Sequence, residues 1–294
     1  MKQSELEAFQ AVAATASFSR AAEQLKLTQP AVSKRIANLE DSLGTRLFDR
    51  VGKQVLMTPA GSALAGEAGK VLAAMRDAER AIADLSGEPS GTLRVATSHH
   101  IGLHRLAPIL RAYAAAYPAV QLDIRFEDSE DAHRLVANGQ VELAVVTLAD
   151  ALSPTLETLR EERVWRDELR FVIAADHSLA RRKRVTLAQL ADAPAILPGS
   201  KTYTGRIVSE LFASAGLSLE PTLSTNYLET VRMLVEAGLG WSMLPESLIG
   251  DLARLPVRVR ASRDLGIVDN PERSASIAAQ RFAATVRRFG DGKG

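Results

Sequence analysis

The chain has 294 residues, of which 46% are hydrophobic and 24% charged, with a formal net charge of +1 at pH 7. This composition is typical of folded globular proteins, and the length suffices for two or three domains. The absence of cysteine excludes disulfides, thiolate metal sites and cysteine-based catalysis. No stretch approaches the roughly 20 apolar residues of a membrane helix, and the N-terminus lacks the basic region of a signal peptide. We therefore expect a cytoplasmic protein with no membrane partner.

Three short helices are predicted at the N-terminus. Ser17 is the expected N-cap of the second helix and Thr28 that of the third, which ends at Gly44. Lys26 and Leu27 form the tight connection between these two helices. Apolar residues recur at helical spacing and mark the inward faces of the first and third helices: Leu6, Phe9, Ala13 and Ala16, then Val32, Ile36, Leu39 and Leu43.

Residues 45–58 are predicted to form a strand pair with its turn at Val51, Gly52 and Lys53. The three short helices match helix-turn-helix geometry, and the strand pair completes a first domain of residues 1–58. The third helix begins with side chains suited to base edges, since glutamine pairs with adenine and lysine with guanine or phosphate. The alternative is a three-helix domain whose charges are merely solvated. The predicted DNA-contacting residues are Thr28, Gln29, Pro30, Ser33, Lys34, Arg50 and Lys53.

A long helix is predicted from Pro59 to about Ser86, followed by a hinge that extends the segment to residue 90. Thr58 is its N-cap, and proline suits the first helical position. A narrow apolar stripe with charged flanks indicates a coiled-coil seam between two subunits, and the alternative is one helix packed on its own domain. Heptad position a holds Ala68, Met75 and Ile82, and position d holds Leu64, Val71, Ala78 and Leu85.

Residues 91–294 alternate between strand and helix patterns, which predicts an α/β domain with a mostly parallel sheet. The final helix is expected from Pro271 to Phe289. Predicted strands cover 93–97, 120–126, 143–147, 168–174, 222–225 and 241–244, and predicted helices cover 101–117, 130–138, 204–215 and 228–237.

Several motifs together resemble those of LysR-type transcriptional regulators, and the resemblance extends over essentially the whole chain. They are Phe18-Ser19-Arg20-Ala21-Ala22-Glu23-Gln24-Leu25, Thr28-Gln29-Pro30-Ala31-Val32-Ser33, Leu47-Phe48, Thr58-Pro59, Gly91-Thr92-Leu93-Arg94-Val95 and Gly238-Leu239-Gly240. The resemblance implies a winged helix-turn-helix, a linker helix (59–90) for dimerisation, and a periplasmic-binding-protein-like (type 2) effector domain (91–294). It also implies a homodimer or homotetramer that works with promoter DNA and RNA polymerase.

In such a domain, two α/β subdomains are joined by two crossover segments and enclose a ligand. Here the resemblance places subdomain I at about 91–163 and 267–294, and subdomain II at about 164–266. The crossovers are expected near Arg163–Arg166 and Ser262–Gly266. Strand ends and helix starts meet at such a cleft, where free N–H groups favour a small anionic or polar effector. Seven candidates lie at these points, although each one can equally be a cap or turn residue: Ser98, His99, Ser129, Thr147, Thr202, Tyr203 and Asn226.

Three histidines cluster after the first strand of the effector domain. His100 and His104 are spaced to share a helical face that a metal would accept, but no carboxylate lies near them in the sequence. We therefore predict neither a metal nor any other cofactor, and interpret His99, His100 and His104 as pocket-lining or capping residues. The basic run Arg181–Arg184 is interpreted as a solvated turn rather than as a phosphate contact.

These features predict a transcriptional regulator whose promoter binding responds to a small-molecule effector. One alternative is a solute-binding protein, suggested by residues 91–294 alone. A second, weaker alternative is a hydrolase. Neither G-x-S-x-G, nor a P-loop, nor a Rossmann G-x-G-x-x-G occurs in the chain, so no catalytic residue is predicted and the protein is not expected to be an enzyme.

Overall fold

The computed structural model describes residues 1–51, 54–149 and 158–290. The contacts of the chain divide it into an N-terminal unit, Met1–Ser86, and a larger unit that begins at Gly87. Among the described residues, no helix combines the length and the apolar character needed to cross a membrane.

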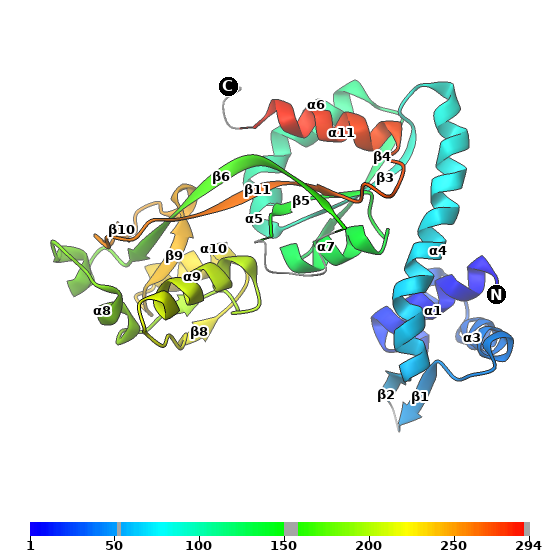
Figure 1. Cartoon of the computed structure of the whole chain (residues 1–294), viewed down its shortest axis with the longest axis horizontal. Coiled ribbons are helices and arrows are strands. Elements are labelled where there is room, and N and C mark those ends of the chain that lie inside the picture. Colours follow the sequence, from blue (N-terminus) through cyan, green and yellow to red (C-terminus); the bar gives the residue numbers. More distant parts are fainter. Residues whose placement is uncertain (52–53, 150–157, 291–294) are drawn as a thin grey trace. The chain divides into compact units, whose positions relative to one another are not determined.

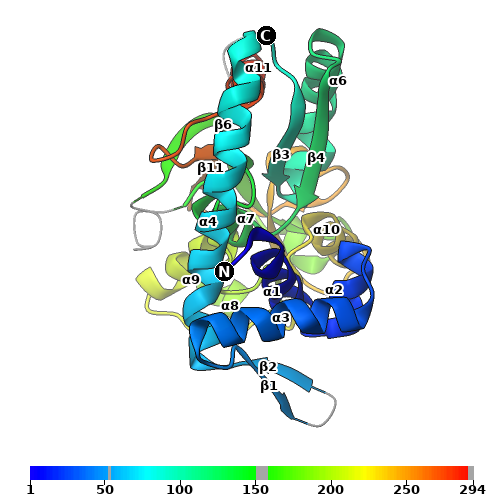
Figure 2. The same ribbon diagram turned by 90° about the vertical axis from the view of Figure 1, so that its right-hand side faces the viewer.

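The N-terminal unit is a three-helix domain followed by a hairpin and a long helix (Figure 2). Its elements are α1 (Gln3–Thr15), α2 (Phe18–Leu25), α3 (Gln29–Leu43), the antiparallel pair β1 (Phe48–Val51) and β2 (Gln54–Met57), α4 (Pro59–Ala83) and η1 (Asp84–Ser86). The side chains of Ser17, Thr28 and Thr58 accept the N-cap hydrogen bonds of α2, α3 and α4, as predicted. The expected turn at residues 52–53 lies outside the described residues.

The core of this unit contains most of the predicted inward residues and the first half of α4. Two positions differ from the prediction. Ala16 lies beyond the end of α1, with a φ of 48°, and Leu43 is 42% exposed because it ends α3 beyond the edge of the core. The buried members include Leu6, Phe9, Val12, Val32, Ile36, Leu39, Leu47, Ala68 and Leu72.

The apolar stripe of α4 is buried in its first part and exposed in its second part. Leu64 and Ala68 pack into the core of their own unit, as the alternative interpretation expected. Further along the helix and in η1, the stripe is exposed, and this exposure reaches 72% at Ile82 and 84% at Leu85. Val71 and Met75 are each 39% exposed. The single chain therefore buries only the first part of the stripe.

The first half of the larger unit is built on three parallel strands, β3 (Gly91–Thr97), β4 (Val120–Phe126) and β5 (Leu143–Thr147), with β3 in the middle. Figure 1 shows α6 (Ala107–Ala116) and α11 (Ile277–Arg288) on one face of these strands and α7 (Ser129–Ala137) on the other. The final helix is shorter than predicted, because Ser276 supplies the cap that starts it.

A helical run leads from β3 into α6 and contains an irregular turn. It comprises α5 (His99–Ile101), the π-helical turn η2 (Gly102–Leu106) and then α6. Pro108 has no N–H with which to continue an α-helical ladder, and proline is a common cause of such a local change. His100 lies just before this wider π-helical turn, and His104 lies within it.

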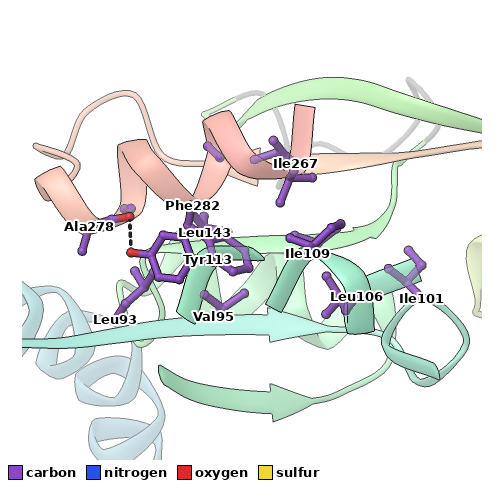
Figure 3. Close-up of a cluster of buried hydrophobic side chains, with 14 of the residues drawn as sticks. Leu93, Val95, Ile101, Leu106, Ile109, Tyr113, Leu143, Ile267, Ala278 and Phe282 are labelled. Atoms are coloured by element: carbon purple, nitrogen blue, oxygen red, sulfur yellow. Dashed lines mark hydrogen bonds between the residues drawn. The ribbon is translucent and has the colours of Figure 1, made fainter. Parts of the chain in front are cut away.

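Alternate residues of β3 and β5 point to the two helical layers. Leu93, Val95 and Leu143 face α6 and α11, where Tyr113 and Phe282 complete the cluster drawn in Figure 3. The Tyr113 hydroxyl donates a hydrogen bond of 2.9 Å to the carbonyl oxygen of Ala278. Burial raises the pKa of Tyr113 to about 12, so this hydroxyl remains a donor at neutral pH.

Two long strands connect the halves of the larger unit, β6 (Arg160–Ile173) and β11 (Ala261–Asp269), which pair antiparallel to each other (Figure 1). The crossover segments predicted near 163–166 and 262–266 lie inside these strands. At the register shift beside Gly266, an added Cβ would lie 2.0 Å from the Glu162 carbonyl oxygen, so glycine is required there.

The prediction of a mostly parallel sheet was wrong. β6 pairs antiparallel with β11, β9 (Ser242–Pro245) and β10 (Ala253–Arg254), and β11 pairs antiparallel with β5. The parallel pairs are β3 with β4, β3 with β5, and β7 (Ile196–Leu197) with β8 (Leu223–Ser224). The alternation of elements did not reveal that the crossovers are themselves strands that run back along the sheet.

The second half packs α8 (Leu187–Ala191), α9 (Tyr203–Ser214) and α10 (Leu228–Glu236) around the far ends of β6 and β9. Trp241 and Phe212 stack with 5.6 Å between ring centroids at its centre. The basic run at residues 181–184 is exposed in the turn before α8, as predicted.

Candidate functional site

The carboxyl ends of the parallel strands meet at one cavity between the two halves of the larger unit. Ser98 follows β3, Ser129 begins α7 after β4, and Thr147 ends β5. From the other half, Thr202 precedes α9, Tyr203 begins it, and the loop after β8 supplies Asn226. All seven residues predicted at the cleft line this cavity, which has a volume of about 50 Å³.

Several of these side chains already have local hydrogen-bond partners. The Thr202 hydroxyl donates to the Gly199 carbonyl oxygen at 2.8 Å and accepts from the Gly205 N–H at 3.0 Å, so it caps α9. The Ser129 hydroxyl accepts from the Thr147 N–H at 3.2 Å. Ser98 precedes α5 without accepting a capping bond. The Ser98 hydroxyl is therefore not used as a helix cap, while Thr202 plays the capping role that was its alternative interpretation.

Two carboxylates of the first half bind polar groups of the second half across the cavity. The Asn226 side-chain amide donates to Asp128 Oδ2 at 2.6 Å, and its oxygen accepts from the Gly199 N–H at 3.1 Å. The Glu130 carboxylate accepts a short hydrogen bond from the Tyr203 N–H at the start of α9. Because a helix N-terminus favours negative charge, Glu130 occupies a position suited to an anion.

A buried ion pair joins the two crossover strands at the cavity. Arg263 on β11 contacts Asp167 on β6 with N–O distances of 3.0 and 3.3 Å, and it also donates to the Thr204 hydroxyl at 3.0 Å. Arg105 binds the other oxygen of Asp167 at 2.9 Å. Burial opposes ionisation of Asp167, but its contact with His100 and the charge of Arg263 hold its pKa well below the usual range. Asp167 is therefore a buried carboxylate anion.

The histidine cluster lies beside this ion pair. The His99 ring packs against Tyr227 and Phe126, with centroid separations of 4.7 and 5.4 Å. His104 Nε2 lies 2.9 Å from Glu229 Oε1, and His100 Nδ1 lies 3.5 Å from the same oxygen. Contact with His100 outweighs partial burial and lowers the pKa of Glu229 to about 2. Glu229 belongs to α10, so it meets the histidines from the other half of the unit.

The start of α3 forms the second candidate surface. Gln29, Pro30 and Lys34 are exposed, and the Gln29 side-chain amide donates to the Ser33 hydroxyl at 3.0 Å. The Thr28 hydroxyl caps the helix and faces the same end. The side chain of Arg50 and the whole of Lys53 lie outside the described residues.

Sequence reasoning missed the charged residues that organise the cavity: Asp128, Glu130, Asp167, Glu229 and Arg263. Each comes from an element whose partners are distant in the sequence, for example 96 residues between Asp167 and Arg263. The one available signal was Arg263 itself, a charged residue within a segment expected to form a crossover. Its partner on the other crossover was not identifiable from spacing.

A helix-turn-helix followed by a two-part α/β unit, with a polar cavity between its halves, is the architecture of a DNA-binding protein that responds to a ligand. The chain matches the family model described as "Bacterial regulatory helix-turn-helix protein, lysR family" over residues 4–62. It matches the model described as "LysR substrate binding domain" over residues 86–291. The chain belongs to the LysR family of transcriptional regulators, with a DNA-binding helix-turn-helix and an effector-binding domain.

Relatives and solved structures agree with this assignment. The chain is 59% identical over 103 residues to an uncharacterised HTH-type transcriptional regulator from Azotobacter vinelandii, covering 35% of this chain and 72% of that protein. It is 28% identical to a probable RuBisCO transcriptional regulator from Trichormus variabilis, covering 96% of this chain and 86% of that protein.

The fold matches two full-length regulators. For an OxyR variant from Pseudomonas aeruginosa, the TM-score is 0.67 at 22% identity, with 99% of this chain and 96% of that chain covered. For CbnR in complex with its target DNA, the TM-score is 0.64 at 20% identity, with 99% of this chain and 100% of that chain covered. At these identities the likeness concerns the fold.

Proposed function

We propose that the protein binds promoter DNA through α3 as a dimer, and that a small anionic or strongly polar effector in the cavity changes this binding. The observation that carries the proposal is the convergence of seven polar residues, from both halves of the larger unit, on one cavity. The protein acts in the cytoplasm on RNA polymerase recruitment and catalyses no reaction of its own. Its dimers can pair into tetramers through the effector domain.

An anionic effector suits the start of α9. There the Tyr203 N–H already binds a carboxylate, that of Glu130. A carboxylate or phosphate on an effector would make the same contact, and it would have to displace Glu130 to do so. A second cavity of about 340 Å³ shares Glu130, Thr202, Tyr203 and Asn226 with the first. Movement of Glu130 would therefore open more room for the effector.

The cavity is a binding site rather than a catalytic one. Among the described residues that line it, the hydroxyls of Ser129 and Thr202 bind backbone groups instead of a histidine. Ser98 and His99 are neighbours in the sequence, whereas a nucleophile and its base are brought together from separate segments. These contacts support a regulator that senses a ligand.

Effector binding acts through the relative arrangement of the two halves. The bonds Asn226–Asp128 and Tyr203–Glu130 join the halves across the cavity, so a ligand that replaces either bond changes the balance between open and closed arrangements. The shift in DNA affinity is limited by the effector's differential affinity for the two arrangements, typically about 1–3 kcal/mol.

The experiment is a mobility shift on promoter DNA with a panel of small mono- and dicarboxylates, inorganic phosphate and sulfate. In Ser98→Ala and Thr147→Val, we expect the active anion to be needed at about tenfold higher concentration, equivalent to roughly 1.4 kcal/mol, with DNA binding in its absence unchanged. In Glu130→Gln the active anion should be effective at lower concentration, because a competing carboxylate is removed.

Ser209→Ala on the exposed side of α9 is the matched control and should respond as the wild type does. An unchanged response in Ser98→Ala, Thr147→Val and Glu130→Gln together would show that the effector binds elsewhere.

A further inference from the structure

The geometry points to a divalent metal site formed by His100, His104 and Glu229, which takes a first-row ion of the Zn²⁺ class and joins the two halves of the effector domain. Their ligand atoms all lie within 4.8 Å of one another. The spacing of His100 and His104 suits a metal, but the carboxylate of the site lies 125 residues from His104, so spacing along the chain did not identify it. This inference goes beyond the proposed regulation by an effector.

The donor spacing is close to that of a coordination sphere. Donors around a tetrahedral ion with bonds of about 2.0–2.1 Å lie about 3.3 Å apart. Here Glu229 Oε1 lies 2.9 Å from His104 Nε2 and 3.5 Å from His100 Nδ1. The two imidazole rings are neighbours, with 4.9 Å between centroids; His100 lies in α5 and His104 lies within the π-helical turn η2 that follows it. Small side-chain rotations would bring all three donors onto one ion.

His100 provides an independent indication of a missing partner. Its side chain is only 5% exposed, yet neither ring nitrogen forms a hydrogen bond within the part of the chain that the structure describes. Its two nearest anionic atoms, on Asp167 and Glu229, are each 3.5 Å away. A buried imidazole ordinarily satisfies its nitrogens, and an ion bound at Nδ1 would satisfy one of them.

Asp167 is placed to orient His100 for this task. His100 Nε2 faces Asp167 Oδ2, so the tautomer with its proton on Nε2 leaves the Nδ1 lone pair directed to Glu229. A histidine that binds a metal usually donates its other ring N–H to a carboxylate, and Asp167 would be that carboxylate here. Arg105 and Arg263 already neutralise Asp167, so Glu229 supplies the anionic ligand.

The donor set selects the kind of ion. Two imidazole nitrogens and one carboxylate oxygen suit Zn²⁺ and its neighbours, whereas Mg²⁺ and Ca²⁺ prefer oxygen ligands alone. Three protein donors leave one position of a tetrahedral ion for water or for an anionic group. His100 also lines the effector cavity. The bound ion would therefore hold α5 and η2 to α10 and add positive charge beside the effector.

The test measures Zn²⁺ by equilibrium dialysis, and Co²⁺ by its absorption spectrum, on the full chain after treatment with a chelator. We expect one ion per chain, and at least tenfold weaker binding in both His104→Gln and Glu229→Gln. His104 is 37% exposed at its side chain, so this substitution leaves the core intact. Asp167→Asn should weaken binding about 10–100-fold without removing a donor.

Matched controls are His177→Gln and Glu236→Gln. His177 precedes η4 (Ser178–Arg181), and Glu236 lies at the other end of α10 from Glu229. Both variants should bind Zn²⁺ as the wild type does. Failure of the wild type to take up millimolar Zn²⁺ or Co²⁺, or full binding by His104→Gln, overturns the proposal. These readouts involve no DNA and no effector, so they are independent of the outcome of the mobility-shift experiment.

Discussion

Arg263 Nη2 donates to Asp167 Oδ2 at 3.0 Å, and the two residues are only 6% and 4% exposed. The pair connects β11 to β6, the two strands that run from one half of the effector domain to the other. Through Thr204, Arg263 is also bonded to the first turn of α9. A change in the relative arrangement of the halves must therefore either preserve this pair or break buried, charged hydrogen bonds.

Loss of Arg263 should strongly destabilise the effector domain. Arg263→Met leaves Asp167 buried with fewer partners, and breaking a buried ion pair typically costs about 3–5 kcal/mol. Urea unfolding of the full chain measures the change. Arg254→Met, which breaks an exposed pair with Glu246, is the control and should cost less than about 1 kcal/mol. A loss of similar size in both variants would contradict the prediction.

The contribution of Glu229 to stability should depend on pH. The fold lowers the pKa of Glu229 from its ordinary value of 4.5 to about 2. The ionised carboxylate therefore stabilises the fold fully at pH values above 4.5, and this contribution is lost as the pH falls toward 2. Since the side chain is 31% exposed, solvent screening limits the contribution to about 1 kcal/mol.

The measurement compares metal-free wild type with Glu229→Gln by urea unfolding across this pH range. The difference in free energy of unfolding should be largest near neutral pH and should shrink in acid. Glu236→Gln should show no such trend. A difference that is constant with pH would mean that the charge of Glu229 does not matter.

Base reading by α3 should depend on Gln29. Gln29→Ala should relax the preference at one base pair by about 1–3 kcal/mol, because a bidentate contact with adenine is lost. Lys34→Met should weaken binding to all sequences and lower the slope of log affinity against log salt by about 1, if Lys34 contacts a phosphate.

A panel of single-base operator variants measures both effects, with Gln280→Ala on α11 as a control that leaves binding unchanged. Identical base preferences in wild type and Gln29→Ala would remove Gln29 from base recognition.

The exposed stripe of α4 should mediate dimerisation. Val71→Asp combined with Met75→Asp places charge in an apolar seam, which should abolish the dimer and with it the binding of paired half-sites about 10–10.5 base pairs, or a multiple, apart. Sedimentation and a mobility shift on the full operator report the two effects.

Lys70→Asp makes the same two-unit change of charge on the exposed side of α4, outside the stripe, and should leave the dimer intact. A double variant that still sediments as a dimer would show that the subunits associate through another surface.

The sequence by itself determined the elements whose signals are local. Caps at Ser17, Thr28 and Thr58 placed the starts of α2, α3 and α4, and the apolar spacing of residues 143–147 matched β5 at both ends. Helical and strand periodicities arise from neighbouring residues, so they are readable without knowledge of the fold. The family motifs extended this to the whole architecture, and the places of strand ends and helix starts identified seven of the residues that line the cavity.

The tertiary structure decided what depends on pairing between distant segments. It showed that β6 and β11 run antiparallel, because the direction of a strand in a sheet follows from its partners. It also brought Asp167 to Arg263, and Glu229 to His100 and His104. The sequence alone argued against a metal because the histidines had no carboxylate nearby, and only the fold places α10 beside η2. Electrostatic partners act through a few ångströms of space, whereas sequence spacing records only the distance along the chain.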